Sequence, residues 1–166
     1  MLLIAKHISQ INMTQLAYVY KESNRRQANE FRDDRPEGLR LLDAEMDLYE
    51  YLCEFLRDRN SFCAIWLEND RYVAAVRIEP FLDGMLLSGL ETASAERGKG
   101  IAGRLLHEVV IFLAGHGYKK VYSHIARHNY SSVSVHVRNG FVKSLDYARC
   151  VDGSILRSMD TYCLNL

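Results

Sequence analysis

The sequence predicts an α+β fold in which a mostly antiparallel sheet is flanked by helices. Between residues 62 and 92, three short apolar runs are separated by turn signals at Asn69-Asp70 and Gly84, a pattern typical of antiparallel strands. Stretches with apolar residues at helical spacing precede and follow these runs. At 166 residues, with 48% hydrophobic and 25% charged residues, the chain suits one domain with a substantial core. We therefore expect residues 1–166 to form a single domain.

The N-terminal third is predicted to contain one strand and two helices. The apolar run 2–8 favours a first strand, and Asn12 is typical of the N-cap of a helix that continues to about residue 22. Residues 21–38 are charged and polar, which predicts a mobile connection. From 39 to 57, apolar residues at helical spacing predict the second helix; they are Leu41, Leu48, Leu52 and Phe55.

The remainder of the chain is predicted to alternate strands with helices. Gly115 and Gly117 end a helix that carries an apolar stripe. Residues 132–137 alternate like a strand and are rich in Val, so propensity alone predicts strand there. The predicted boundaries are strands at 62–67, 72–78 and 85–92, a helix at 100–114, a strand at 120–126, a short segment at 129–139, and hairpin arms at 141–150 and 154–163 around Asp152-Gly153.

Composition argues against several classes of protein. The 21 basic and 21 acidic residues balance, so there is no electrostatic footprint for nucleic acid or an anionic membrane. Cys53, Cys63, Cys150 and Cys163 lie far apart with no Cys-x-x-Cys pair, and we expect reduced thiols and no metal. The apolar run 1–5 is too short for a signal sequence, and no stretch approaches the ~20 apolar residues of a membrane span. We expect a cytoplasmic protein without nucleic-acid or membrane partners.

The most informative part of the sequence is a glycine-rich stretch that leads into a helix, Glu96-Arg-Gly-Lys-Gly-Ile-Ala-Gly-Arg-Leu-Leu106. Such a loop leaves backbone N–H groups unpaired at the positive end of the helix dipole, where phosphate or pyrophosphate binds. Gly98 and Gly100 allow an anion to approach the main chain closely, and Arg97 and Lys99 add positive charge. The stretch predicts a phosphorylated cofactor.

Two families use a loop of this kind. Gly98-x-Gly100-x-x-Gly103 matches the dinucleotide fingerprint, whereas Arg97-x-x-Gly100-x-Ala102 resembles the acyl-CoA loop of the GNAT-superfamily N-acetyltransferases. A dinucleotide fold needs a βαβ unit and an acidic residue about 20 residues beyond the glycines. Residues 123–126 contain no Asp or Glu. The context therefore disfavours a dinucleotide-binding protein, which we keep as a minor alternative.

The resemblance to the GNAT superfamily covers essentially the whole chain. It implies a GNAT-like mixed sheet with the element order β-α-α-β-β-β-α-β-α-β-β, and it implies a helix at 129–139. The features that carry it are the loop Arg97-Gly-Lys-Gly-Ile-Ala102, the strand 121–125 followed by Asn129, and Asn129-(x)6-His136-x-Arg138-x-Gly140-Phe141, which is similar to the family's Asn…Tyr-x-Lys-x-Gly-Phe segment.

The resemblance also implies how acetyl-CoA would bind as cosubstrate. The loop would hold the pyrophosphate through main-chain N–H groups. The end of the preceding strand would separate from strand 120–126 and pair with pantetheine like an added strand, and one of its N–H groups would polarise the thioester carbonyl. The cofactor-binding residues so implied are Leu90, Glu91, Thr92, Arg97, Gly98, Lys99, Gly100, Ala102, Gly103 and Asn129.

The chemistry requires a base for the acceptor amine, and the thiolate leaving group benefits from an acid. His136 stands where the family usually has a tyrosine that protonates the sulfur, so it is either a replacement acid or a packing residue in an enzyme that uses water. The position of His124 resembles the one where protein N-terminal acetyltransferases of the family have a Glu or His that acts as the base. Glu91 is the other candidate base. The alternative interpretation of His124 is a structural histidine on a strand face, whose ring hydrogen-bonds to a neighbouring residue.

The sequence thus predicts an N-acetyltransferase that moves an acetyl group from acetyl-CoA to a primary amine by direct transfer in a ternary complex. The substituted His136 keeps a non-catalytic acyl-CoA-binding sensor open as the alternative. The acceptor is a small-molecule or peptide amine. The connection 21–38 mixes both charge signs, so its charge favours neither cationic nor anionic acceptors. A homodimer is compatible with the family, and nothing in the residues decides it.

Overall fold

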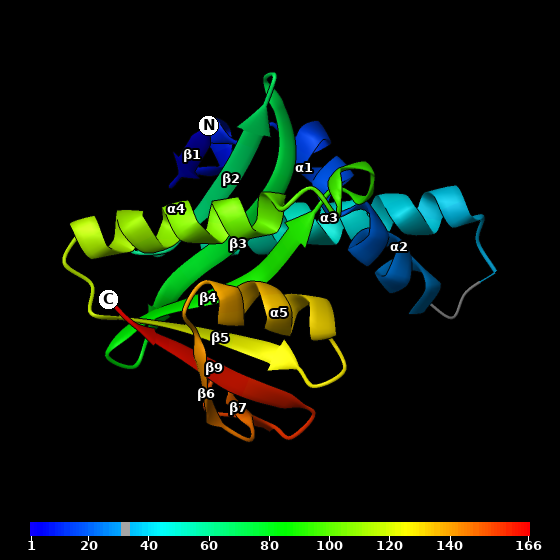
Figure 1. Cartoon of the computed structure of the whole chain (residues 1–166). Helices are drawn as coiled ribbons and strands as arrows, with labels where there is room; N and C mark the ends of the chain where they lie inside the picture. Colours follow the sequence, from blue (N-terminus) through cyan, green and yellow to red (C-terminus); the bar gives the residue numbers. More distant parts are fainter. Residues whose placement is uncertain (31–33) are drawn as a thin grey trace.

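The computed structural model describes residues 1–30 and 34–166 (Figure 1). The helices are α1 (Met13–Val19), α2 (Lys21–Glu30), α3 (Glu37–Phe55), α4 (Ile101–Gly115) and α5 (Tyr130–Arg138), with 3-10 turns at Ile8–Gln10 and Ser94–Glu96. The strands are β1 (Leu2–Ala5), β2 (Phe62–Glu68), β3 (Arg71–Phe81), β4 (Gly84–Thr92), β5 (Lys120–Ala126), β6 (Val142–Leu145), β7 (Ala148–Arg149), β8 (Ile155–Leu156) and β9 (Met159–Asn165).

Seven of these strands form one sheet in the order β1-β2-β3-β4-β5-β9-β6, and β7 and β8 form a separate pair. Every neighbouring pair of the large sheet is antiparallel except β4 and β5, which run parallel. Helices cover both faces of the sheet (Figure 1). The predicted fold class, a mostly antiparallel mixed sheet flanked by helices, is confirmed.

Each face of the sheet carries its own apolar layer. On one face, Leu105 and Val109 of α4 pack with Val76 of β3, all fully buried. On the opposite face, Leu52 of α3 packs with Ile65 of β2. Fully burying one such side chain contributes about 1.5–3 kcal/mol relative to exposure. None of the helices in the described ranges is long and apolar enough to cross a membrane.

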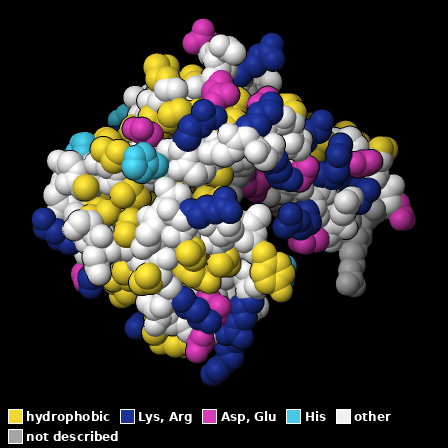
Figure 2. Space-filling model, in the orientation of Figure 1, with side chains coloured by type: hydrophobic (Ala, Val, Ile, Leu, Met, Phe, Trp, Pro, Cys, Tyr) yellow, Lys and Arg dark blue, Asp and Glu magenta, His cyan; other side chains and the backbone are white. Residues whose placement is uncertain are grey.

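The prediction of a mobile connection at residues 21–38 is wrong for 21–30, which form α2; residues 31–33 of that prediction lie outside the described residues. The sequence of this helix is almost entirely polar, charged side chains gather over its region of the surface (Figure 2), and only Asn24 and Ala28 are buried. The helix therefore has no apolar stripe that a hydrophobic-period analysis could detect. Polar contacts dock it on α3 instead: Gln27 Nε2 donates to Asp47 Oδ2 at 2.8 Å and Arg40 Nη1 donates to the Ala28 carbonyl at 3.1 Å.

The C-terminal elements follow the predicted order with two local differences. Residues 130–138 form a helix, as the family resemblance implied and propensity did not, because the Asn129 side chain accepts the Ser132 N–H and caps it. The final hairpin turns at Gly153, whose φ is +86°. Its arms are interrupted, so that β6 and β9 belong to the large sheet while β7 and β8 pair separately.

The parallel pair β4 and β5 separates towards its C-terminal end. Residues Met85–Leu87 pair with Val121–Ser123, and beyond them the two strands are not paired. A bulge lies where the separation begins: Gly89, with φ +60°, and Leu90 together face the single residue Val76 of β3. The bulge leaves the β5-facing edge of β4 without a strand partner, which is an opening at which an extended ligand can add to the sheet.

Candidate active site

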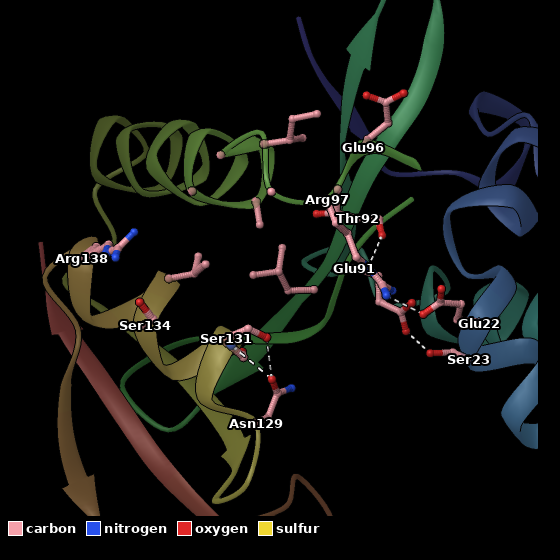
Figure 3. A pocket seen from close by; sticks show the side chains of 18 of the residues that line it. Glu22, Ser23, Glu91, Thr92, Glu96, Arg97, Asn129, Ser131, Ser134 and Arg138 are labelled. Carbon is pink, nitrogen blue, oxygen red and sulfur yellow. Dashed lines mark hydrogen bonds and ion pairs between the residues drawn. The ribbon is translucent and has the colours of Figure 1, made fainter. Parts of the chain in front are cut away.

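A cleft of about 660 Å³ opens between the end of β4, the start of α4 and the helix α5 (Figure 3). Helix α2 closes one end of it: Glu22 and Ser23 lie beside Glu91 and Arg97, whereas Asn129, Ser131 and Ser134 line the α5 side (Figure 3). The residues that line the cleft are Glu22, Ser23, Arg26, Leu90, Glu91, Thr92, Glu96, Arg97, Gly98, Gly100, Ile101, Ala102, Gly103, Asn129, Ser131, Ser132, Ser134, Val135 and Arg138.

The loop before α4 offers a row of free main-chain donors. Gly98 and Gly100 have φ of +77° and +74°, a conformation suited to glycine. The first helical bond runs from the Arg104 N–H to the Gly100 carbonyl, and within the described residues no acceptor is found for the N–H groups of residues 98–103. These donors lie at the positive end of a 15-residue helix, an arrangement that binds phosphate groups.

The two cations of the loop are already paired. Arg97 donates from Nη1 to Glu22 Oε2 at 2.5 Å and from Nε to the Thr92 carbonyl at 3.2 Å, and Lys99 Nζ contacts Glu96 Oε2 at 2.7 Å. Lys99 does not line the cleft, unlike the other loop residues expected to bind the cofactor. We therefore expect the main chain to be the principal anion binder of the loop, with Arg97 assisting only if it exchanges Glu22 for a phosphate.

This pairing makes a prediction about Glu22. The substitution Glu22→Gln frees Arg97 and removes a negative charge from the cleft, so CoA should bind up to several-fold more tightly, with the gain shrinking at high salt. Arg97→Ala should weaken CoA binding. Calorimetric titration with CoA at two salt concentrations measures both effects, and weaker binding in the Glu22 variant would contradict the competition between Glu22 and phosphate.

Sequence reasoning missed several residues of the cleft. Ser131, Ser134 and Arg138 point into it from one side of α5, at spacings of three and four residues that would have indicated a common helix face. Arg138 adds a cation to the cleft that was not expected to bind the cofactor. Glu22 and Arg26 were missed because α2 itself was not predicted.

Glu91 combines access to the cleft with an environment that changes its proton affinity. Its carboxylate accepts a short hydrogen bond from the Ser23 hydroxyl of α2. Burial raises the pKa of Glu91 above its usual value, and this is only partly offset by the Ser23 hydrogen bond and by the charges of Arg97, Arg26 and Arg77. A carboxylate with a raised pKa beside a cofactor cleft is suited to accept a proton from an amine.

His124 lies on the other side of the sheet from α4. Its ring packs edge-on against Phe81 with centroids 5.3 Å apart, and it does not line the cleft. Its Nε2 is buried with no hydrogen-bond partner in the described part of the chain, and burial lowers the pKa of the imidazole. His124 is thus half-buried and favours the neutral form, and its assignment as base stays a prediction.

His136 is buried inside the fold and not in the cleft. Its exposure is 1%, its Nδ1 lies 2.8 Å from the Ser132 carbonyl, and its ring packs edge-on against Phe141. Because Nδ1 must donate to that carbonyl, the neutral ring has no N–H at Nε2, which is buried without a partner in the described residues. The geometry favours the packing interpretation over the predicted acid.

The burial of His136 has a consequence for stability. Burial lowers the pKa of His136, although the Ser132 carbonyl opposes this, so the unfolded state binds its proton more readily. Stability should therefore fall as pH decreases through about 6.5, the unfolded value. His136→Phe should reduce that loss while acetyl transfer stays near the parent rate. Denaturant unfolding at several pH values tests this, and a pH dependence equal to the parent's would contradict it.

One of three comparisons with known proteins places the chain in a family. The model of the acetyltransferase (GNAT) family matches residues 22–141, more than half of the chain, so the chain belongs to this family of acyltransferase enzymes. A search of curated proteins found no match.

Solved structures show the same fold at low identity. The PaiA N-acetyltransferase of Thermoplasma acidophilum in complex with coenzyme A has a TM-score of 0.69 at 14% identity, covering 100% of this chain and 99% of that one. The ribosomal-protein-alanine N-acetyltransferase of Brucella melitensis gives 0.69 at 19% identity, covering 99% of each chain. An Elizabethkingia anophelis GNAT-family acetyltransferase with acetyl-CoA bound gives 0.59 at 16% identity, covering 70% of this chain and 82% of that one.

Proposed function

We propose that this protein is an N-acetyltransferase that moves the acetyl group of acetyl-CoA directly to a primary amine in a ternary complex. The observation that carries the proposal is one continuous cleft. It joins the free N–H groups of the loop before α4 to the unpaired edge of β4 and to the half-buried Glu91. Binding of CoA or acetyl-CoA by two structures of the same fold supports the choice of cosubstrate.

The cleft offers separate places for the parts of acetyl-CoA. The N–H groups of residues 98–103 hold the pyrophosphate, as the family loop does. The edge of β4 from Leu90 to Thr92 pairs with the amide groups of pantetheine. Asn129, which caps α5 and lines the cleft, lies on the side opposite β4 and contacts the same arm.

The residues around the acyl group supply the steps of transfer. Glu91 takes a proton from the acceptor ammonium group, and the freed amine attacks the thioester carbonyl. A backbone N–H at the β4 bulge stabilises the oxyanion that forms. The C–S bond then breaks, and water protonates the thiolate, which is a fair leaving group because its conjugate acid has a pKa of about 8.5.

Direct transfer is favoured over an acetyl-enzyme intermediate by the contents of the cleft. A covalent route needs a nucleophile with an adjacent base. The four cysteines are free thiols, and none of them lines the cleft in the described part of the chain. Ser131 and Ser134 on the α5 side lie across the cleft from Glu91 (Figure 3). Ser23 donates its hydroxyl to Glu91 and is therefore the residue on which a covalent route would leave an acetyl group.

The experiment that tests this function is acceptor-dependent release of thiol from acetyl-CoA across a panel of primary amines. We expect release well above the rate without amine for at least one acceptor class. CoA binding without turnover of any amine would instead support a non-catalytic acyl-CoA sensor. Tight NADP binding without CoA binding would contradict the cofactor assignment.

A further inference from the structure

Three side chains on adjacent strands leave polar atoms buried and unsatisfied on the sheet face that α1 and α3 cover. They are Arg77 Nε on β3, Ser88 Oγ on β4 and His124 Nε2 on β5, and none has a hydrogen-bond partner within residues 1–30 and 34–166. Arg77 and Ser88 are directly paired across β3 and β4, so their side chains share a face. Unsatisfied buried polar atoms are rare, and an ordered water or a bound ligand is what usually satisfies them.

The Arg77 guanidinium is held in place without a carboxylate in direct contact among the described residues. It lies over the Tyr51 ring at 4.9 Å and the Tyr20 ring at 5.9 Å from the centroids. In the described ranges, no carboxylate forms an ion pair with it. A partly buried guanidinium between aromatic rings keeps its fork of N–H donors available for a planar anion.

Arg77 also lies directly against the bulge of β4. A Cβ on Gly89 would come within 2.6 Å of Arg77 Nη2, and the Gly89 carbonyl accepts a hydrogen bond from the Tyr20 hydroxyl at 2.7 Å. The bulge immediately precedes Leu90–Thr92, the edge at which the acyl group is expected. A group bound by Arg77 is therefore a neighbour of both the acyl group and Glu91.

The charges around Arg77 favour a monoanion. Glu79 and Glu91 both interact electrostatically with Arg77. Burial raises the pKa of each carboxyl, and the positive charge of Arg77 opposes this rise. Two nearby acidic groups repel a dianionic phosphate more strongly than a singly charged carboxylate, and a carboxylate can pair with the guanidinium fork in a bidentate manner. Tyr51 is 45% exposed, and Arg77 beneath it is itself only partly buried.

We propose that the acceptor is a small primary amine that carries a carboxylate, and that Arg77 binds this carboxylate while Ser88 and His124 add hydrogen bonds. The proposal rests on the N-acetyltransferase function proposed above and specifies its acceptor class. Burial keeps His124 neutral at pH 7, so it can donate or accept a hydrogen bond. With the carboxylate at Arg77, the amine of the same molecule extends towards Glu91.

The test compares amino acids with the corresponding amino-acid amides, which keep the amine and remove the negative charge. For the parent enzyme we expect kcat/KM to favour the acids by at least about 10-fold, the size of one good charged hydrogen-bonded contact. Arg77→Gln should bring the ratio to within about two-fold and leave CoA affinity unchanged, and Arg77→Lys should restore part of the preference. Arg71→Gln, an exposed arginine on the same strand, is the matched control and should keep the parent ratio.

A binding measurement separates this inference from the proposed function. Calorimetric titration of amino acids into the CoA complex should show binding by the parent and by the Arg71 variant, and at least 10-fold weaker binding by the Arg77 variants. If no amine is acetylated but this pattern holds, the proposed catalysis fails and the carboxylate site stands. Equal turnover of acids and amides by the parent, or equal binding by the Arg77 variants, would overturn the inference.

Discussion

Glu91→Gln should lower kcat/KM by about 100-fold or more, because the amide keeps the shape and the Ser23 contact of Glu91 but cannot take a proton from the acceptor amine. CoA affinity should change little, since the groups that we propose to bind CoA are main-chain donors of the loop. Steady-state kinetics with a productive amine and calorimetric titration with CoA measure the two effects. Ser23→Ala is a useful companion, because it removes the hydrogen bond that lowers the pKa of Glu91.

The pH profile identifies the base. Burial raises the pKa of Glu91 above the usual value of about 4.3. The base must be ionised to act, so kcat/KM of the parent should rise with pH through an apparent pKa above the usual value for Glu. Ser23→Ala should shift this apparent pKa to higher pH. If His124 is the base instead, His124→Ala removes the rising limb and costs about 100-fold. A full rate with an unchanged profile in Glu91→Gln would exclude Glu91.

Gly100→Val should weaken CoA binding by more than ~10-fold, about 1.4 kcal/mol. Gly100 has φ +74°, which a β-branched residue rarely adopts, and a side chain there would occupy the space in front of the free N–H groups. Gly115→Val is the control, because its Cβ also meets nothing within 4 Å and its φ is not positive. Parent-like CoA affinity in the Gly100 variant would contradict the main-chain cradle.

The features predicted well from sequence are those encoded locally. The loop was identifiable because glycines at 98 and 100 supply positive φ immediately before an amphipathic helix. The hairpin around Asn69-Asp70 and the Asn12 cap were likewise set by short-range signals. Helix α5 shows the limit: its Val-rich alternation favours strand, and packing of Val133 and Val135 on the core, with the cap, decides for helix.

The features missed from sequence depend on contacts between distant segments. Helix α2 is polar, and its docking on α3 through Gln27 and the Ala28 carbonyl carries no hydrophobic period. His136 occupies the position expected for an acid, but whether its N–H faces sulfur or a carbonyl is set by the fold around it. Arg77 gave no sequence signal, because the rings that hold it come from distant segments: Tyr20 lies between α1 and α2, and Tyr51 lies in α3.

The most direct test of the account is a single-turnover reaction with acetyl-CoA and a productive amine, followed by mass spectrometry of both the amine and the protein. The account predicts one acetylated amine for each thiol released, Glu91-dependent formation of this product, and no acetyl group on the protein at any time. An acetylated protein that later transfers its acetyl group to the amine would contradict direct transfer. Thiol release without any acetylated amine would contradict the function itself.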